Sequence, residues 1–173
     1  SRNDRPEKMS NLRKTISRRL VEAKNTTAML TTFNEVDMGP IMDIRKKLNE
    51  FGLERSKMQR QFHETFLQSV CLHLYKDDPD VDMEKIMRVN NWEDLRQSVL
   101  CMTPRRFGKT TAVSMFVAAY AMCVPNSTQS IFSTGRRASQ KLLELIRDLV
   151  KKTSWADRIV KCNQEEFILQ GDS

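Results

Sequence analysis

The longest apolar stretch, residues 112–124 (AVSMFVAAYAMCV), constrains the fold most. It is broken by Ser114 and ends before Pro125, and it falls short of the roughly 20 residues that a membrane-spanning helix needs. It therefore predicts a buried helix in a globular chain that makes no membrane contact. The chain has 173 residues, enough for one ordinary domain or a small domain with an appendage, which nearly excludes a two-domain enzyme.

Strand-like and helix-like segments alternate around this stretch. Residues 97–102 (QSVLCM) and 129–134 (QSIFST) are short apolar runs of strand length, and residues 167–169 are a weaker third candidate. Helical spacing follows the second run, at Leu142, Leu145, Ile146 and Leu149. This alternation is typical of a parallel α/β sheet with flanking helices.

The N-terminal half predicts a helix, a strand and three further helices. Ser10 is placed to cap a helix that carries Leu12, Ile16 and Leu20 at four-residue spacing. Residues 28–36 (AMLTTFNEV) favour a strand, and Pro40 is placed to open the next helix. Residues 57–76 then form a long amphipathic pattern, and Asp82 is a candidate cap for a short helix.

The formal net charge is +7, and its sign alternates along the chain. Residues 1–48 hold 11 Lys/Arg and 6 Asp/Glu, residues 49–100 hold 7 and 10, and residues 101–173 hold 11 and 6. A basic balance is compatible with polyanion partners. The four cysteines show no metal-ligand spacing, and the first residues have no apolar signal-peptide core, so a soluble intracellular chain with reduced thiols is expected.

The sharpest motif lies between a predicted strand and a predicted helix, the context of a phosphate-binding loop. In such loops, backbone N–H groups surround nucleotide phosphates, a lysine reaches the β and γ oxygens, and a hydroxyl coordinates Mg²⁺. Without an anion, the basic side chains of this loop would crowd the positive end of a helix dipole. The predicted binding residues are Thr103, Pro104, Arg105, Arg106, Phe107, Gly108, Lys109, Thr110 and Thr111, with Thr103 in place of the usual first glycine.

The motif TPRRFGKTT, followed by IFSTGRRASQKLLELI, resembles the motor ATPase of the large terminase subunit, which packages viral DNA. The resemblance covers residues 57–173. It implies ATP and Mg²⁺ as cofactors, with Lys109 on the β/γ phosphates, Thr110 on the metal, and Arg105 or Arg106 at the γ-phosphate. It further implies nucleotide and double-stranded DNA as partners and a viral DNA-packaging location, and it places adenine contacts near Gln59, Gln61 and Phe62.

The sequence departs from a complete motor of this class. No run of four apolar residues ending in Asp-Glu follows the loop, and Glu165 and Glu166 precede an apolar run instead of following one. The expected fold is therefore a partial P-loop NTPase parallel sheet with flanking helices. The expected function is an ATP-binding fragment of a DNA-packaging motor, and whether it is an enzyme is left open.

A second resemblance covers the N-terminal part. Residues 7–48, including the run AMLTTFNEVDM, resemble the start of the catalytic domain of the dihydrolipoyl succinyltransferases, the acyltransferase core of the 2-oxoglutarate dehydrogenase complex. This resemblance implies oligomerisation and a mitochondrial location. That family uses a His-x-x-x-Asp-Gly motif to deprotonate a thiol. Neither His63 nor His73 has this context, so both are expected to be ordinary helix histidines.

The two resemblances predict a chimera: an acyltransferase-like helix–strand–helix appendage (residues 1–48), a joint (49–56) and a truncated P-loop domain (57–173). A fragment of a succinyltransferase is the alternative to the motor. A third possibility is a nucleic-acid-binding module that acts through charge alone. Its candidate phosphate contacts, more simply a solvated helix face, are Arg136, Arg137, Lys141, Lys151 and Lys152.

Overall fold

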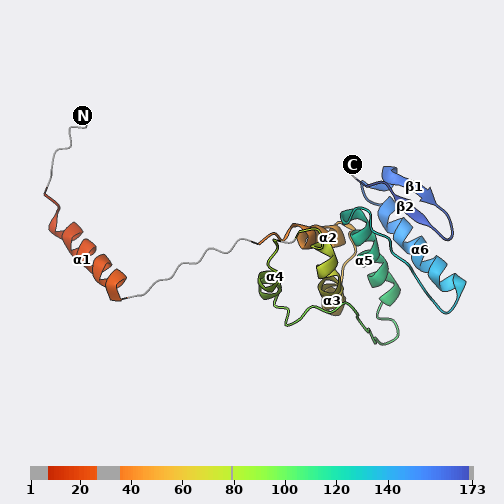
Figure 1. Ribbon diagram of the computed structural model, residues 1–173, viewed down its shortest axis with the longest axis horizontal. Helices are drawn as coiled ribbons and strands as arrows, with labels where there is room; N and C mark the ends of the chain where they lie inside the picture. Colours follow the sequence, from red (N-terminus) through yellow and green to blue (C-terminus); the bar gives the residue numbers. More distant parts are fainter. Residues whose placement is uncertain (1–7, 27–35, 79, 172–173) are drawn as a thin grey trace. The chain divides into compact units, whose positions relative to one another are not determined.

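The computed structural model describes residues 8–26, 36–78 and 80–171. The chain divides into two units, residues 1–35 and 36–173. The first unit contains helix α1 (Asn11–Thr26), and the second contains all the other elements (Figure 1). These are the helices α2 (Gly39–Glu50), α3 (Lys57–Leu74), α4 (Met83–Asn90), α5 (Lys109–Cys123) and α6 (Arg136–Lys151), a short 3₁₀ helix η1 (Ala156–Arg158), and strands β1 (Ile159–Cys162) and β2 (Phe167–Leu169).

The helices begin where the sequence predicts them. The Ser10 hydroxyl accepts a hydrogen bond from the Arg13 N–H at the start of α1, and Pro40 lies in the first turn of α2. Ser56 and Gln59 form a reciprocal capping box at α3, while the Asp82 carboxylate accepts from the Lys85 N–H at α4. These local signals confirm the predicted helices. No helix in the described ranges is long and apolar enough to cross a membrane.

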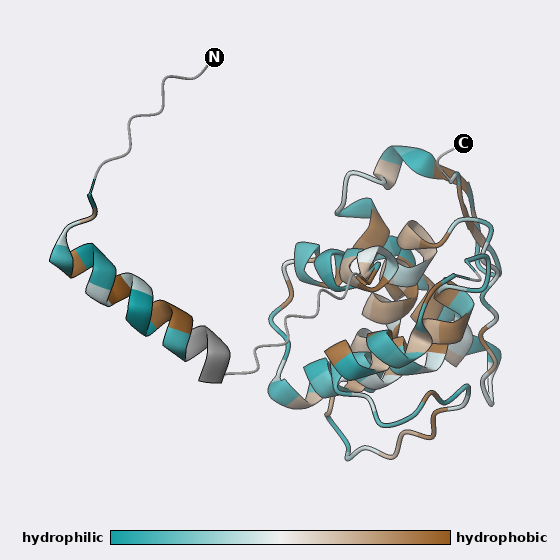
Figure 2. Ribbon diagram, turned by 60° about the vertical axis from the view of Figure 1, so that its left-hand side comes forward, coloured by the Kyte–Doolittle hydropathy of each residue, from teal (hydrophilic) through white to brown (hydrophobic). Residues whose placement is uncertain are grey.

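Helix α5 is the centre of the second unit. It is apolar around its circumference and contacts α2, α3 and α6. The core is built from Ile44 and Leu48 of α2, Leu67 of α3, Met115 of α5 and Ile146 of α6, all at most 2% exposed. Figure 2 shows apolar segments on the helices that face this interior. The buried helix predicted for residues 112–124 is therefore confirmed.

The predicted strands are only partly present. Residues 97–102 and 129–134 are not strands in the structure, and Leu100, Met102 and Phe132 are about 90% exposed. Residues 167–169 do form β2, which pairs antiparallel with β1, with Ile159 opposite Leu169 and Cys162 opposite Phe167. This ribbon is the one sheet among the described residues, so the parallel P-loop sheet stays a prediction that nothing here shows. The predicted strand at residues 28–36 falls almost wholly outside the described residues.

Helix α1 leaves its apolar stripe uncovered within the first unit. Leu12, Ile16 and Leu20 are 72%, 49% and 65% exposed, and Arg13 and Arg19 lie at the edges of this stripe by helical spacing. Isolated helices of this length are marginal in water, and most helical stability comes from packing of the apolar face. The described part of the first unit therefore presents a basic amphipathic helix without a packing partner of its own.

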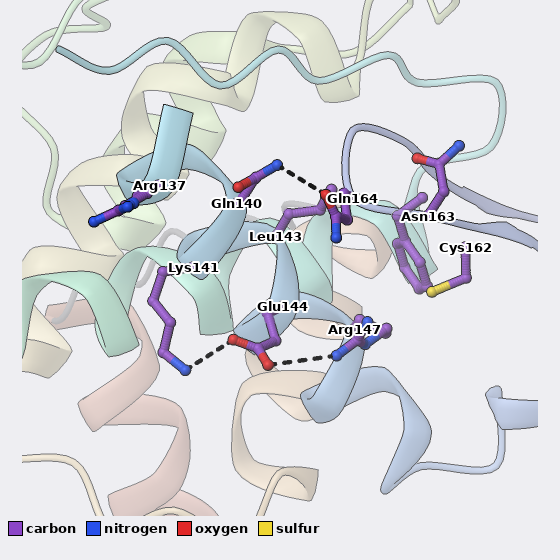
Figure 3. A pocket seen from close by; sticks show the side chains of 10 residues that line it. Arg137, Gln140, Lys141, Leu143, Glu144, Arg147, Cys162, Asn163 and Gln164 are labelled. Atoms are coloured by element: carbon purple, nitrogen blue, oxygen red, sulfur yellow. Dashed lines mark hydrogen bonds and ion pairs between the residues drawn. The ribbon is translucent and has the colours of Figure 1, made fainter. Parts of the chain in front are cut away.

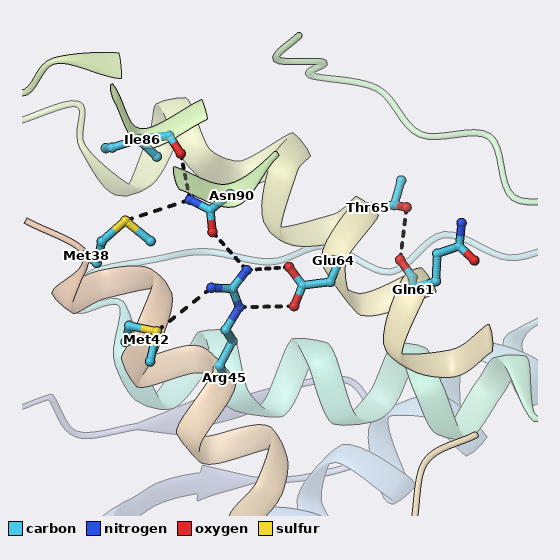
Figure 4. A network of polar contacts seen from close by, with 8 residues as sticks. All are labelled: Met38, Met42, Arg45, Gln61, Glu64, Thr65, Ile86 and Asn90. Carbon is cyan, nitrogen blue, oxygen red and sulfur yellow. Dashed lines mark hydrogen bonds and ion pairs between the residues drawn. The ribbon is translucent and has the colours of Figure 1, made fainter. Parts of the chain in front are cut away.

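An arginine joins three helices of the second unit (Figure 4). The Arg45 guanidinium on α2 donates from Nε to Glu64 Oε1 (3.0 Å) and from Nη2 to Glu64 Oε2 (2.5 Å), and Glu64 lies on α3. The same Nη2 donates to Asn90 Oδ1 at the end of α4, at 3.0 Å. Asn90 in turn donates to the Ile86 carbonyl. This bidentate pair with a shared third acceptor fixes α2, α3 and α4 together.

A buried histidine joins α3 to α5. The side chain of His63 is 1% exposed; its Nε2 lies 2.9 Å from the Ala112 carbonyl, and its Nδ1 lies 3.0 Å from Arg55 Nη1. A carbonyl can only accept and a guanidinium can only donate, so the proton resides on Nε2 and Nδ1 accepts. Burial lowers the pKa of His63, and the nearby charge of Arg55 lowers it further, against opposing effects of the Ala112 carbonyl and Glu64.

We expect Arg45→Ala to lower the free energy of unfolding by about 1–2 kcal/mol, because three hydrogen bonds to oxygen and a weaker one to Met42 Sδ are lost, and no other described side chain bonds Glu64. Urea unfolding followed by circular dichroism measures this change. The matched control is Arg96→Ala, which removes a more exposed pair with Asp94 and is expected to change stability by less than about 0.5 kcal/mol. Equal losses in the two variants would contradict a joining role for Arg45.

We expect the unfolding free energy to fall as the pH drops below about 6.5, the ordinary pKa of histidine. The unfolded chain takes up a proton at this pH, whereas folded His63 has a lowered pKa and resists protonation. Stability is therefore full above this value and is lost on acidification. Denaturation curves between about pH 7.5 and pH 5.5 measure the slope. His63→Gln should remove the histidine contribution and His73→Gln, at an exposed position of α3, should retain it; the reverse pattern would refute the assignment.

Candidate functional site

The loop of residues 103–108 leads into α5, and a glycine permits its final turn. Gly108 is the N-cap of α5 with φ +82°, a conformation that side chains rarely adopt. A Cβ at this position would lie 2.8 Å from Gln59 Nε2. No side chain caps α5, and its first turn contains no acidic residue. The N-terminus of α5 therefore lies at the surface of the second unit without a side-chain cap, although most of the helix is buried.

Two side chains hold this loop in place. Gln59 on α3 donates from Nε2 to the Phe107 carbonyl at 3.2 Å. Lys109 donates from Nζ to the Thr103 carbonyl at 3.2 Å, so this side chain joins the first residue of α5 to the first residue of the loop. The Thr103 hydroxyl is buried and has no hydrogen-bond partner. The structure thus brings Thr103 and Lys109 together around the turn at Gly108, as the motif predicted, although the lysine bonds the loop backbone.

The remaining predicted residues are dispersed. Arg105 and Arg106 are exposed, neither makes a hydrogen bond or ion pair with a described residue, and Arg106 has φ +65°. The Phe107 ring lies edge-on to Phe62, with ring centroids 6.0 Å apart. Three further predicted residues, Pro104, Thr110 and Thr111, are exposed. The loop therefore presents two unpaired arginines and no acid.

The expected metal and adenine contacts gain no support from the geometry. Within residues 8–26, 36–78 and 80–171, no group of three or more His, Cys, Asp or Glu side chains is placed to hold a metal ion. Gln59 already bonds the loop, Phe62 is buried and Gln61 is an exposed surface residue. The proposed roles of Thr110 in binding Mg²⁺ and of Lys109 in binding ATP stay untested predictions.

The histidines fit structural roles. His63 is a core residue held on both ring nitrogens, and His73 is an exposed residue whose ring stacks on Tyr120 with centroids 6.3 Å apart. His73 is followed four residues later by Asp77, but Asp78 stands where the acyltransferase motif has glycine. The chain has only these two histidines, so it contains no candidate for the thiol-deprotonating base in its expected context.

Sequence reasoning missed two polar features. The bond between Gln59 and Phe107 joins residues 48 positions apart, and no local pattern signals it. A cavity between α6 and the β1–β2 ribbon was also missed, because β1 is short, exposed and interrupted by Lys161, and therefore lacks the apolar pattern of a strand.

Comparison with known proteins finds similarity in the N-terminal half. Residues 1–84 match the family of 2-oxoacid dehydrogenase acyltransferases, catalytic domain. The chain is 38% identical over 108 residues to the dihydrolipoyllysine-residue succinyltransferase component of the 2-oxoglutarate dehydrogenase complex of Escherichia coli strain K12, which covers 61% of the chain and 26% of that protein. It is 44% identical over 77 residues to the corresponding component of Bartonella vinsonii subsp. berkhoffii (44% and 18%) and 36% identical over 109 residues to the human mitochondrial component (60% and 23%).

These matches correct the main functional prediction. The relatives are succinyltransferases, and neither they nor the matching family support a terminase, a nucleotide partner or a DNA partner. The prediction of an ATP-binding fragment of a DNA-packaging motor is therefore wrong. Its physical weakness lies in the loop, which lacks the first glycine, follows no strand and uses Lys109 to bond its own backbone.

The acyltransferase resemblance, in contrast, is confirmed and extends beyond the residues that first suggested it. No solved structure matches the chain significantly. The chain spans about a quarter or less of the length of these curated relatives. Residues 1–84 are thus a segment similar to the catalytic domain of the 2-oxoacid dehydrogenase acyltransferases.

Proposed function

We propose that this chain belongs to a dihydrolipoyllysine-residue succinyltransferase and that residues 1–84 contribute to its catalytic acyltransferase domain. The match of the family model over these residues carries the proposal. Relatives from bacteria and from mitochondria, all named as components of the 2-oxoglutarate dehydrogenase complex, support it. The reaction in their name, transfer of a succinyl group to a dihydrolipoyl lysine, is the activity in which this segment would take part.

The contribution we infer is assembly with other acyltransferase subunits. The exposed stripe of Leu12, Ile16 and Leu20 on α1 gains stability only by packing against another surface. Basic residues beside the stripe, such as Arg13 and Arg19, favour a partner with an acidic rim. Because both histidines lack the context of the catalytic base, we expect the chain by itself to transfer no succinyl group.

We expect this chain to enter assemblies of the E. coli succinyltransferase when the two proteins are refolded together. Mixed assemblies should transfer less succinyl group per subunit from succinyl-CoA to dihydrolipoamide, because the incorporated chains supply no base. Size-exclusion chromatography with light scattering measures incorporation, and a thiol-coupled assay measures transfer.

The control variant replaces Leu12, Ile16 and Leu20 with Asp, positions that are exposed in the first unit and therefore leave the core of the second unit intact. This variant should neither co-elute nor lower the activity. Failure of the unmodified chain to co-elute, or equal incorporation of the variant, would rule out the proposed role of α1.

A further inference from the structure

A polar cavity lies between α6 and the β1–β2 ribbon, outside residues 1–84, which match the acyltransferase family (Figure 3). Its volume is about 350 Å³, within the range of small-molecule sites. Figure 3 shows Arg137 and Lys141 of α6 on one side of the cavity, Cys162 and Asn163 on the other, and Arg147 of α6 near Cys162. The cavity therefore combines three cations from one helix with amide and apolar groups from the ribbon.

The charges that line the cavity do not cancel. Glu144 is the one acidic residue among the described residues that line it, and this carboxylate is already engaged by Lys141 at 2.8 Å and by Arg147 at 3.8 Å. Arg147 also pairs with Asp148 at 3.4 Å. Arg137 makes no hydrogen bond or ion pair with any described residue. Three cations against one lining carboxylate leave an excess of positive charge, and Arg137 is the group free to use it.

The ribbon is held against α6 by polar contacts at its turn. Arg136 pairs with Glu165 at 2.6 Å, and Gln140 donates to Gln164 at 3.3 Å. Asn163 Oδ1 accepts from the N–H groups of Glu165 and Glu166, which fixes the turn and leaves the Asn163 amide N–H₂ as a donor. The cavity is therefore formed before any ligand binds.

One part of the lining is apolar. Leu143 of α6 and Phe167 of β2 are half-buried, and both line the cavity. A simple inorganic anion would leave this surface in contact with water, whereas a flat apolar body would cover it. The guanidinium of Arg137 is also suited to a phosphate or carboxylate group, which it can bind with two parallel hydrogen bonds.

We propose that the cavity between α6 and the β1–β2 ribbon binds a small organic dianion that carries a flat apolar body. The anionic group pairs with Arg137 and receives a further donor from Lys141, which lies one turn along α6. The body lies against Leu143 and Phe167. This site is independent of the succinyltransferase assignment, because all its residues lie beyond residue 84.

The test is a calorimetric titration of the full chain with phenyl phosphate at about pH 8, where the phosphate is mostly dianionic. We expect saturable binding, at least about tenfold weaker binding of inorganic phosphate, and no binding of benzyl alcohol. Benzoate, with one negative charge, should bind more weakly than phenyl phosphate but more tightly than benzyl alcohol. Equal affinities for phenyl phosphate and inorganic phosphate, or no binding of phenyl phosphate, would overturn the proposal.

Arg137→Ala should weaken phenyl phosphate binding by about tenfold, the effect of one lost charge-assisted contact. The matched control is Arg60→Ala, an exposed arginine of α3 that does not line the cavity, and its affinity should be unchanged. Both side chains are exposed, so thermal unfolding should show both variants folded. Equal weakening in the two variants would assign the binding to overall charge and refute the site.

Discussion

Burial of α5 is the constraint on which the second unit depends. This helix carries apolar residues on every side, and Ala112, Met115, Ala118 and Ala119 are all at most 2% exposed. A helix of this kind is stable only when other elements surround it, and α2, α3 and α6 do so. Its first turn is in turn fixed by α3, through the bond of His63 to the Ala112 carbonyl. The position of the loop before α5 and of the ribbon beyond α6 therefore follows from the packing of one helix.

The sequence predicted what short-range chemistry determines and missed what depends on distant partners. The caps at Ser10 and Asp82 and the first-turn proline of α2 are local, so the helices were predictable from spacing and capping alone. A strand needs a neighbour, and an apolar run of strand length does not say whether one exists. Residues 97–102 and 129–134 have the composition of strands, yet Leu100 and Phe132 face solvent. Conversely, β1 was missed because its exposed residues resemble a loop until β2 pairs with it.

The same distinction explains the outcome at the candidate site. The spacing of Thr103, Gly108 and Lys109 correctly predicted a loop that precedes a helix, and Gly108 adopts the left-handed conformation that such a loop uses. The spacing of a motif does not define what the loop binds, since Lys109 here donates its hydrogen bond to the Thr103 carbonyl of the same loop. Similarity over more than a hundred residues, as to the E. coli succinyltransferase, samples many independent positions and outweighs a motif of nine. The long match is therefore better evidence for the kind of protein this chain resembles than the geometry of the loop is.

The limits of the family match do not coincide with the limits of the packed core. Residues 1–84, which match the family, include α1, α2 and α3, and of these α2 and α3 pack on α5, which lies beyond residue 84. Ile44, Leu67 and Met115 belong to one hydrophobic cluster, so the parts of the second unit inside and outside the family match share one interior. Only α1 lies in the other unit, with its apolar stripe exposed. A shared core stabilises α2 and α3 without any partner, whereas the described residues of the first unit provide no core for α1. The assembly proposed above should therefore depend on α1 far more than on the rest of residues 1–84.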